Sequence, residues 1–194
     1  MKHESPLDPL LKQISSSMLL SAGLKERLSE FTNIRYYPRQ FVVLKKGEMV
    51  NGVYIMLKGL AHATADAGGA AVSYWFATEG HLLTPAYKNG RDIIVEQPVT
   101  VLEDSFIAYI LYADMARITH EYPDFSRAIA TMQQRYTSNQ AFRAHLLQAP
   151  DEDRLRQVHT QYPGLYNRVE QARVAAFLDM NVARYNELNK VFSQ

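Results

Sequence analysis

The sequence contains no cysteine. This absence excludes disulfide bridges, thiolate metal sites, iron–sulfur clusters held by cysteine and cysteine nucleophiles. No apolar run approaches the roughly 18 residues of a membrane span, and residues 1–10 lack the apolar segment of a signal peptide. We therefore expect a cytoplasmic protein.

The sequence also lacks an excess of charge of either sign. The chain has 21 Lys and Arg against 20 Asp and Glu, a formal net charge of +1. From Asp151 to the end, the chain contains six acidic and six basic residues. Non-specific affinity for DNA comes mostly from neutralising phosphates, so this segment supplies it only if its charges are segregated onto opposite faces.

The signatures of common enzymes are missing as well. There is no Gly-x-Ser-x-Gly elbow, phosphate-binding loop or dinucleotide fingerprint. The six histidines are scattered, and His62, the one inside a predicted strand, has no histidine two residues away as a metal site of the cupin type requires. We expect no catalytic residue, no metal and no cofactor, and hence not an enzyme.

What is present changes character along the chain. Leucines at helical spacing between residues 9 and 31 predict two short helices. Between Ile34 and Ile110, β-branched and aromatic runs alternate with glycine-containing breaks about every ten residues, which predicts a small antiparallel barrel or jelly roll. Gly47, Gly59 and Gly80 are expected to supply positive φ at turns.

A long helix is predicted from about residue 123 to 148. Five of its residues follow the 4-3-4-3 spacing of a two-stranded coiled coil, in which an Asn would fix the register. Packing of this helix on its own barrel explains the pattern equally well. The five residues are Phe125, Ile129, Met132, Tyr136 and Asn139.

The C-terminal segment 170–192 has helical apolar spacing on both sides of a polar break at 179–181. Two helices joined by a tight turn form either a DNA-reading helix-turn-helix or simply a packed pair in a core. In the first case, the candidate DNA contacts are Asn181, Ala183, Arg184, Asn186, Glu187 and Lys190.

The order of these predicted elements, together with three sequence segments, resembles the cyclic-nucleotide-receptor and fumarate-nitrate-regulator (Crp/Fnr) superfamily of bacterial transcription factors. The resemblance is to a short, divergent branch of that superfamily in particular. The three segments are residues 36–63 with their Lys-Gly-Glu turn, 100–110 and 174–188. The resemblance implies an α+β fold: an antiparallel β-roll with flanking helices and a long dimerisation helix in residues 1–148, and a reduced helix-turn-helix domain in 149–194. It also implies a homodimeric DNA-binding regulator.

The roll departs from that family's pattern. No Arg immediately precedes the strand at 100–102, where the family's cyclic-nucleotide binders hold the phosphate, and Pro98 lies there instead. Without this charge-assisted contact, cyclic AMP is not expected as a ligand. Arg91 either meets an anion or is a solvated loop residue beside Asp92. An unknown small ligand could lie against Tyr74, Phe76, Thr84, Tyr87 and Arg91, although aromatic residues on strands are more often core.

The helix pair departs as well. Asp179 replaces the family's turn glycine, and Asp tolerates a left-handed backbone better than most residues. Asn186 and Glu187 replace a Ser/Thr-Arg pair, which removes the commonest contact to guanine. The alternative to a regulator is therefore a module derived from the family that has lost DNA reading and binds a ligand or another protein.

Overall fold

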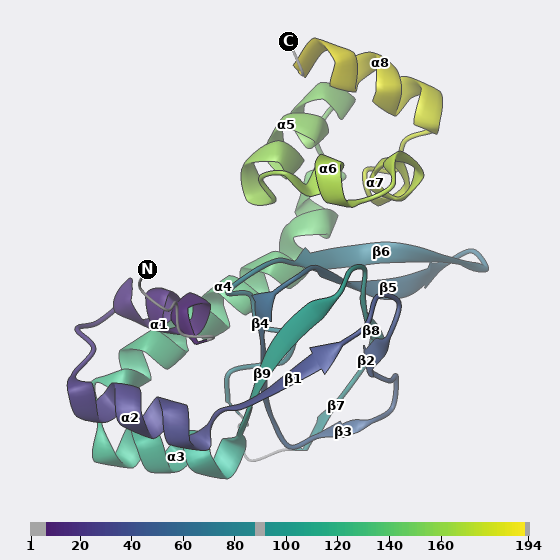
Figure 1. Ribbon diagram of the computed structural model, residues 1–194. Coiled ribbons are helices and arrows are strands. Elements are labelled where there is room, and N and C mark those ends of the chain that lie inside the picture. The colour runs from purple at the N-terminus through teal and green to yellow at the C-terminus, as the bar shows by residue number, and fades with distance from the viewer. Residues whose placement is uncertain (1–6, 88–91, 193–194) are drawn as a thin grey trace. The chain divides into compact units, whose positions relative to one another are not determined.

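The computed structural model describes residues 7–87 and 92–192 (Figure 1). The chain divides into two compact units. We call Met1–Ala61 with Ala77–Thr137 the roll unit, and His62–Phe76 with Ser138–Gln194 the helical unit. Within the described ranges, no helix has the length and apolarity needed to cross a membrane.

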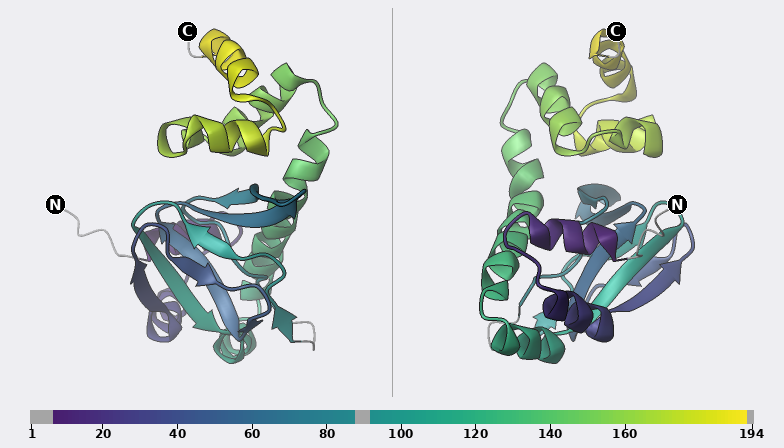
Figure 2. Two further views of the ribbon diagram at one scale, coloured as in Figure 1. Left: turned by 90° about the vertical axis from the view of Figure 1, so that its right-hand side faces the viewer. Right: turned by 60° about the vertical axis from the view of Figure 1, so that its left-hand side comes forward.

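The roll unit begins with the two predicted helices, α1 (Asp8–Ser15) and α2 (Ala22–Phe31). The Ser21 side chain accepts a hydrogen bond from Leu24 N at 3.2 Å and so caps the first turn of α2. With α3 (Tyr112–Glu121), these helices gather on one side of the roll (Figure 2). Leu10, Ile14, Leu24, Leu28 and Ile118 are fully buried there, and Leu11 packs against them half-buried.

The strands of the roll unit are antiparallel, as predicted. β1 (Asn33–Tyr37), β9 (Ser105–Leu111) and β4 (Gly52–Lys58) form one sheet in that order. β2 (Val42–Leu44) pairs with β8 (Val99–Val101). β3 (Met49–Val50) pairs with β7 (Ile93–Ile94).

Turns with left-handed backbone separate these strands. The predicted positive φ is confirmed at Gly47 (83°), Gly59 (115°) and Gly80 (83°). At Gly59 a Cβ atom would also collide with Ser105, so this turn excludes any side chain on two grounds.

One core joins the helices to the sheet. Val53 and Ile55 of β4 and Ile110 of β9 are buried against α1, α2 and α3. Phe125 and Met132 of the long helix α4 (Phe125–Leu146) are buried in the same core, and Ile129 and Tyr136 pack against it half-buried. For these four residues, packing of the helix on its own roll accounts for the spacing, while dimerisation remains a prediction.

The helical unit combines a β-hairpin with the C-terminal helices. β5 (Ala61–Ala67) and β6 (Ala70–Ala77) form the hairpin. The last turns of α4 are followed by α5 (Asp151–Gln161), α6 (Leu165–Arg168), α7 (Gln171–Phe177) and α8 (Val182–Phe192).

An aromatic cluster forms the centre of the helical unit. The Phe76 ring lies 5.0 Å from that of Phe177 and 5.8 Å from that of Tyr162, and Phe142 meets Tyr162 at 5.7 Å. The hairpin and the end of α4 therefore belong with the C-terminal helices. The predicted division at 148/149 placed these segments in the first domain, because strand patterning does not reveal which element covers an outward-facing aromatic residue.

Candidate functional site

The predicted helix pair is present at the C-terminus. Asp179 follows α7 with φ of 56°, in the left-handed region that the sequence led us to expect at this residue. Met180 N donates to Ala175 O at 2.9 Å, which closes the turn. The Asn181 side chain accepts from Arg184 N at 2.8 Å and caps α8, so Asn181 shapes the helix in addition to being exposed.

Two arginines hold the pair in place. Arg154 donates to the carbonyl oxygens of Ala149 (2.7 Å), Leu147 (2.9 Å) and Leu178 (3.0 Å). Arg143 Nε donates to Phe177 O at 2.9 Å. These guanidinium groups satisfy carbonyls at helix ends, so neither is a free phosphate ligand. The sequence alone could not separate these structural arginines from surface ones.

The outward surface of α8 consists mainly of the predicted residues. Ala183, Glu187 and Lys190 are exposed, and Arg184 and Asn186 are half-buried, whereas Tyr185 and Leu188 face the core. Val182, which the apolar spacing had assigned to the core, is 42% exposed at the first position of the helix. The start of α8 is therefore open to a partner.

Arg184 is already balanced by acidic neighbours. Its Nε lies 3.4 Å from Asp151 Oδ2 and its Nη1 lies 3.4 Å from Glu187 Oε2. These hydrogen bonds, to Asp151 first, raise the pKa of Arg184 above its ordinary value. Lys190 forms no ion pair with another residue in the described part of the chain. The positive charge that α8 offers to DNA is consequently small.

The predicted ligand-pocket residues have structural roles or lie at the surface. Phe76 belongs to the aromatic cluster, which is the core alternative. Thr84 Oγ1 accepts from Tyr54 N at 2.9 Å and donates to Gly52 O at 3.1 Å. Tyr74 is half-buried and Tyr87 is 43% exposed. Arg91 lies outside the described residues.

The hydrogen-bond partners of Asn139 were not expected from the sequence. Its side chain is 3% exposed; Nδ2 donates to Phe76 O at 2.7 Å, and Oδ1 accepts from the Tyr162 hydroxyl at 2.6 Å. The coiled-coil spacing predicted an Asn that fixes a dimer register. Here it ties the hairpin to α4 and α5 within one chain.

A buried histidine lies on the same hairpin. His62 Nδ1 is 2.8 Å from Ser73 Oγ and 3.5 Å from Arg173 Nη1. Burial, and then the positive charge of Arg173, lower the pKa of His62 to about 4. His62 is therefore neutral at physiological pH. In the ranges that the structure describes, no three His, Asp or Glu side chains are grouped to hold a metal ion.

No protein-family model matches the chain, and no curated protein matches it by sequence. Solved structures do match it. CLP of Xanthomonas campestris, a global regulator responsive to c-di-GMP, matches with a TM-score of 0.64 and 16% identity over 89% of this chain and 92% of CLP. FixK2 of Bradyrhizobium japonicum gives 0.66 and 9% over 84% of each chain.

A cyclic nucleotide-binding domain from Methylobacillus flagellatus is similar too, with a TM-score of 0.59 and 10% identity over 84% of this chain and 85% of that one. At these identities the likeness establishes the fold. The chain has the α+β fold of the Crp/Fnr regulators and cyclic-nucleotide-binding domains, as the sequence resemblance predicted.

Proposed function

We propose that this protein is a Crp/Fnr-like transcriptional regulator that binds DNA as a homodimer and reads it with α8. The observation that carries the proposal is the helix pair: α7 is buried through Val174 and Phe177, while the first turn of α8 is exposed at Val182 and Ala183. A helix that presents its N-terminal turn in this way fits the DNA major groove.

The side chains of α8 suit direct reading of bases. Asn186 can form paired hydrogen bonds with adenine, and Glu187 can accept from the amino group of cytosine. Arg184 can bind guanine once Asp151 or Glu187 releases it. Because its neighbours include acids, we propose that binding depends on base contacts more than on phosphate neutralisation.

The homodimer needs a surface on α4 other than the face that carries Phe125 and Met132, which is buried in the chain's own core. Five exposed residues follow the same 4-3-4-3 spacing on another face of this helix, and most have short side chains that allow two helices to approach closely. We propose this face as the dimer contact. It comprises Ala130, Gln134, Thr137, Ala141 and Ala144. In sedimentation, Ala141→Arg should give a monomer.

DNA binding is tested by titrating selected genomic fragments with salt. A regulator prefers certain fragments and weakens steeply as salt rises. Lys190→Ala should reduce the slope of log K against log salt by about 0.9, the value for one phosphate contact. Lys46→Ala, which removes an exposed lysine from a turn of the roll unit, is the matched control and should leave the slope unchanged.

The second candidate is a module that no longer reads DNA and binds a ligand or a protein. The observation that favours it is the use of Arg143 and Arg154 as carbonyl ligands together with the pairing of Arg184. Such a module shows no preference among fragments at any salt concentration.

A further inference from the structure

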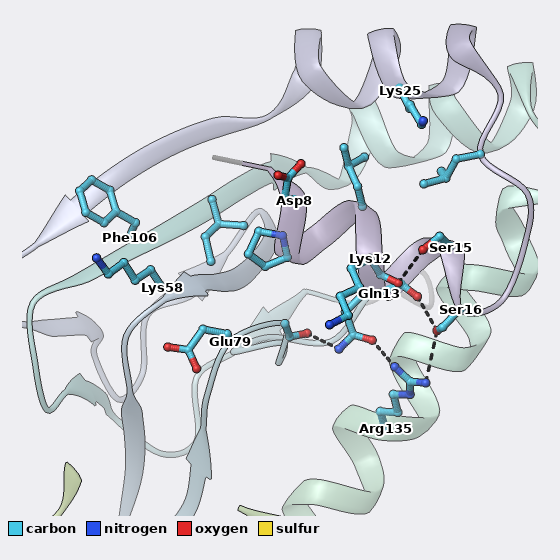
Figure 3. Close-up of a pocket in the computed structure, with 15 residues that line it drawn as sticks. Asp8, Lys12, Gln13, Ser15, Ser16, Lys25, Lys58, Glu79, Phe106 and Arg135 are labelled. Atoms are coloured by element: carbon cyan, nitrogen blue, oxygen red, sulfur yellow. Dashed lines mark hydrogen bonds between the residues drawn. The ribbon is translucent and has the colours of Figure 1, made fainter. Parts of the chain in front are cut away.

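The roll unit contains a groove that neither the DNA-reading surface nor the predicted ligand residues involve. Its volume is about 1310 Å³. It lies between α1, the start of α2, the end of β4, the turn at 79–80 and α4 (Figure 3).

Hydrogen bonds fix the walls of this groove. Gln13 Nε2 donates to Gly80 O at 2.6 Å. The Arg135 guanidinium donates to Gln13 Oε1 and lies 3.4 Å from Ser16 Oγ, as the dashed lines in Figure 3 show. A Cβ at Gly80 would lie 3.0 Å from the Gln13 side chain, so the turn and α1 are in close contact. The groove is thus formed before any ligand arrives.

The floor of the groove is apolar and continues onto the sheet. Leu57 is 3% exposed and lies deep, whereas Phe106 is 42% exposed. Tyr36 pairs with Phe106 across β1 and β9, and the two rings are 5.5 Å apart. Tyr36 is itself 53% exposed, and Ile34, two residues earlier on β1, is 38% exposed. An apolar strip of this kind suits an aliphatic chain.

The groove has a net positive charge, because four cationic side chains line it against two carboxylates. Glu79 Oε1 accepts from Gly59 N at 2.9 Å, and Asp8 lies in the first turn of α1, where the helix dipole favours a carboxylate. Arg135 hydrogen-bonds to neutral groups. Three further cations line the groove, and within the described part of the chain their ammonium groups form no ion pair: Lys12, Lys25 and Lys58.

We propose that this groove binds a small amphipathic anion, a carboxylate or phosphate carried on an aliphatic tail. Lys12 lies near the middle of the groove, whereas Lys58 lies beside Phe106 at one end and Lys25 at the other (Figure 3), so the head group meets Lys12 and the tail lies on Leu57 and Phe106. Because Leu57 is recessed, a single ligand molecule reaches it and a flat bilayer surface does not. The inference concerns the roll unit alone and does not depend on DNA binding.

The test is isothermal titration calorimetry of the full chain with sodium dodecanoate, kept below its aggregation concentration. We expect saturable binding of one molecule per chain, with dodecanol at least tenfold weaker and dodecyltrimethylammonium not bound. Equal binding of all three amphiphiles would overturn the proposal. So would binding to vesicles of phosphatidylcholine and phosphatidylglycerol without binding of dodecanoate, or binding of an acidic amphipathic peptide alone.

Matched variants locate the site. Lys12→Ala should weaken dodecanoate binding up to about fivefold, the contribution of one surface ion pair. Lys46→Ala, at an exposed lysine outside the groove, should have no effect. An equal loss in both variants would refute the assignment.

The apolar floor has its own pair of variants. Phe106→Gln should cost about tenfold in affinity, through lost apolar contact. The control is Phe41→Gln, at a residue that is 47% exposed and does not line the groove. The apolar half of the assignment fails if Phe106→Gln binds dodecanoate as tightly as the parent chain does.

Discussion

Replacing Asn139 with Ala tests how the hairpin is held to the C-terminal helices. The substitution removes the donor to Phe76 O and the acceptor of the Tyr162 hydroxyl, both in a buried site. A buried polar group left without its partner costs about 1–3 kcal/mol. With the small cavity added, we expect Asn139→Ala to lower the free energy of unfolding of the helical unit by about 3 kcal/mol.

The chain provides its own probe for this measurement. Its single tryptophan, Trp75, is 2% exposed on β6 within the helical unit. Urea unfolding followed by Trp75 fluorescence therefore reports on this unit. Tyr162→Phe alone should cost about 1 kcal/mol. Since the two side chains share a hydrogen bond, the double variant should cost about 1 kcal/mol less than the sum of the single variants.

The control is Ser138→Ala, an exposed neighbour on α4 that should leave the unfolding midpoint nearly unchanged. The reasoning is refuted if Asn139→Ala costs less than about 1 kcal/mol, below the range for a buried unpartnered group. It is also refuted if the variant keeps its stability and changes the oligomeric state, the behaviour expected of an Asn in a dimer seam.

Three further predictions follow from backbone geometry and burial. The pKa of His62 is lowered from 6.5 to about 4, so the folded helical unit resists protonation of this side chain. The unit therefore has its full stability above pH 6.5 and loses about 3 kcal/mol of unfolding free energy as pH falls to 4. In His62→Gln, unfolding followed by fluorescence should lose this pH dependence. Asp179→Gly should keep or raise the melting temperature, whereas Asp179→Val should lower the free energy of unfolding by about 1–2 kcal/mol because φ is 56°; equal melting temperatures would contradict this. Gly59→Ala should destabilise the roll unit in urea by more than about 2 kcal/mol and Gly47→Ala by about 1 kcal/mol, since a side chain at Gly59 also meets Ser105 while Gly47 faces open space.

Local chemistry made much of the roll unit predictable. Turn residues at regular intervals indicated antiparallel strands, and the glycines at 47, 59 and 80 have the expected left-handed backbone. Asp179 was likewise expected to tolerate that conformation in the helix pair, and it does. In each case the preference belongs to the residue itself and needs no knowledge of a distant partner.

Partner choice was the part that the sequence could not supply. Heptad spacing in α4 shows that one face is buried, but it does not say against what, and Phe125 and Met132 are buried in the chain's own core. Asn139 meets Phe76, 63 residues away, through a contact that no local pattern encodes. The groove was missed for the same reason, because Lys12, Lys58 and Arg135 come together only in the folded chain.

The absence of cysteine allows the central claim, that α8 meets the DNA groove, to be measured directly. Ala183→Cys places a unique thiol on an exposed position of α8, and an iron chelate attached there cleaves DNA within its reach. On a selected fragment we predict two clusters of cuts about ten base pairs apart, the half-site spacing of a symmetric dimer. The same chelate at Glu26→Cys, on α2, should give no clusters. Cuts spread evenly along the fragment, or equal patterns from both positions, would contradict the account.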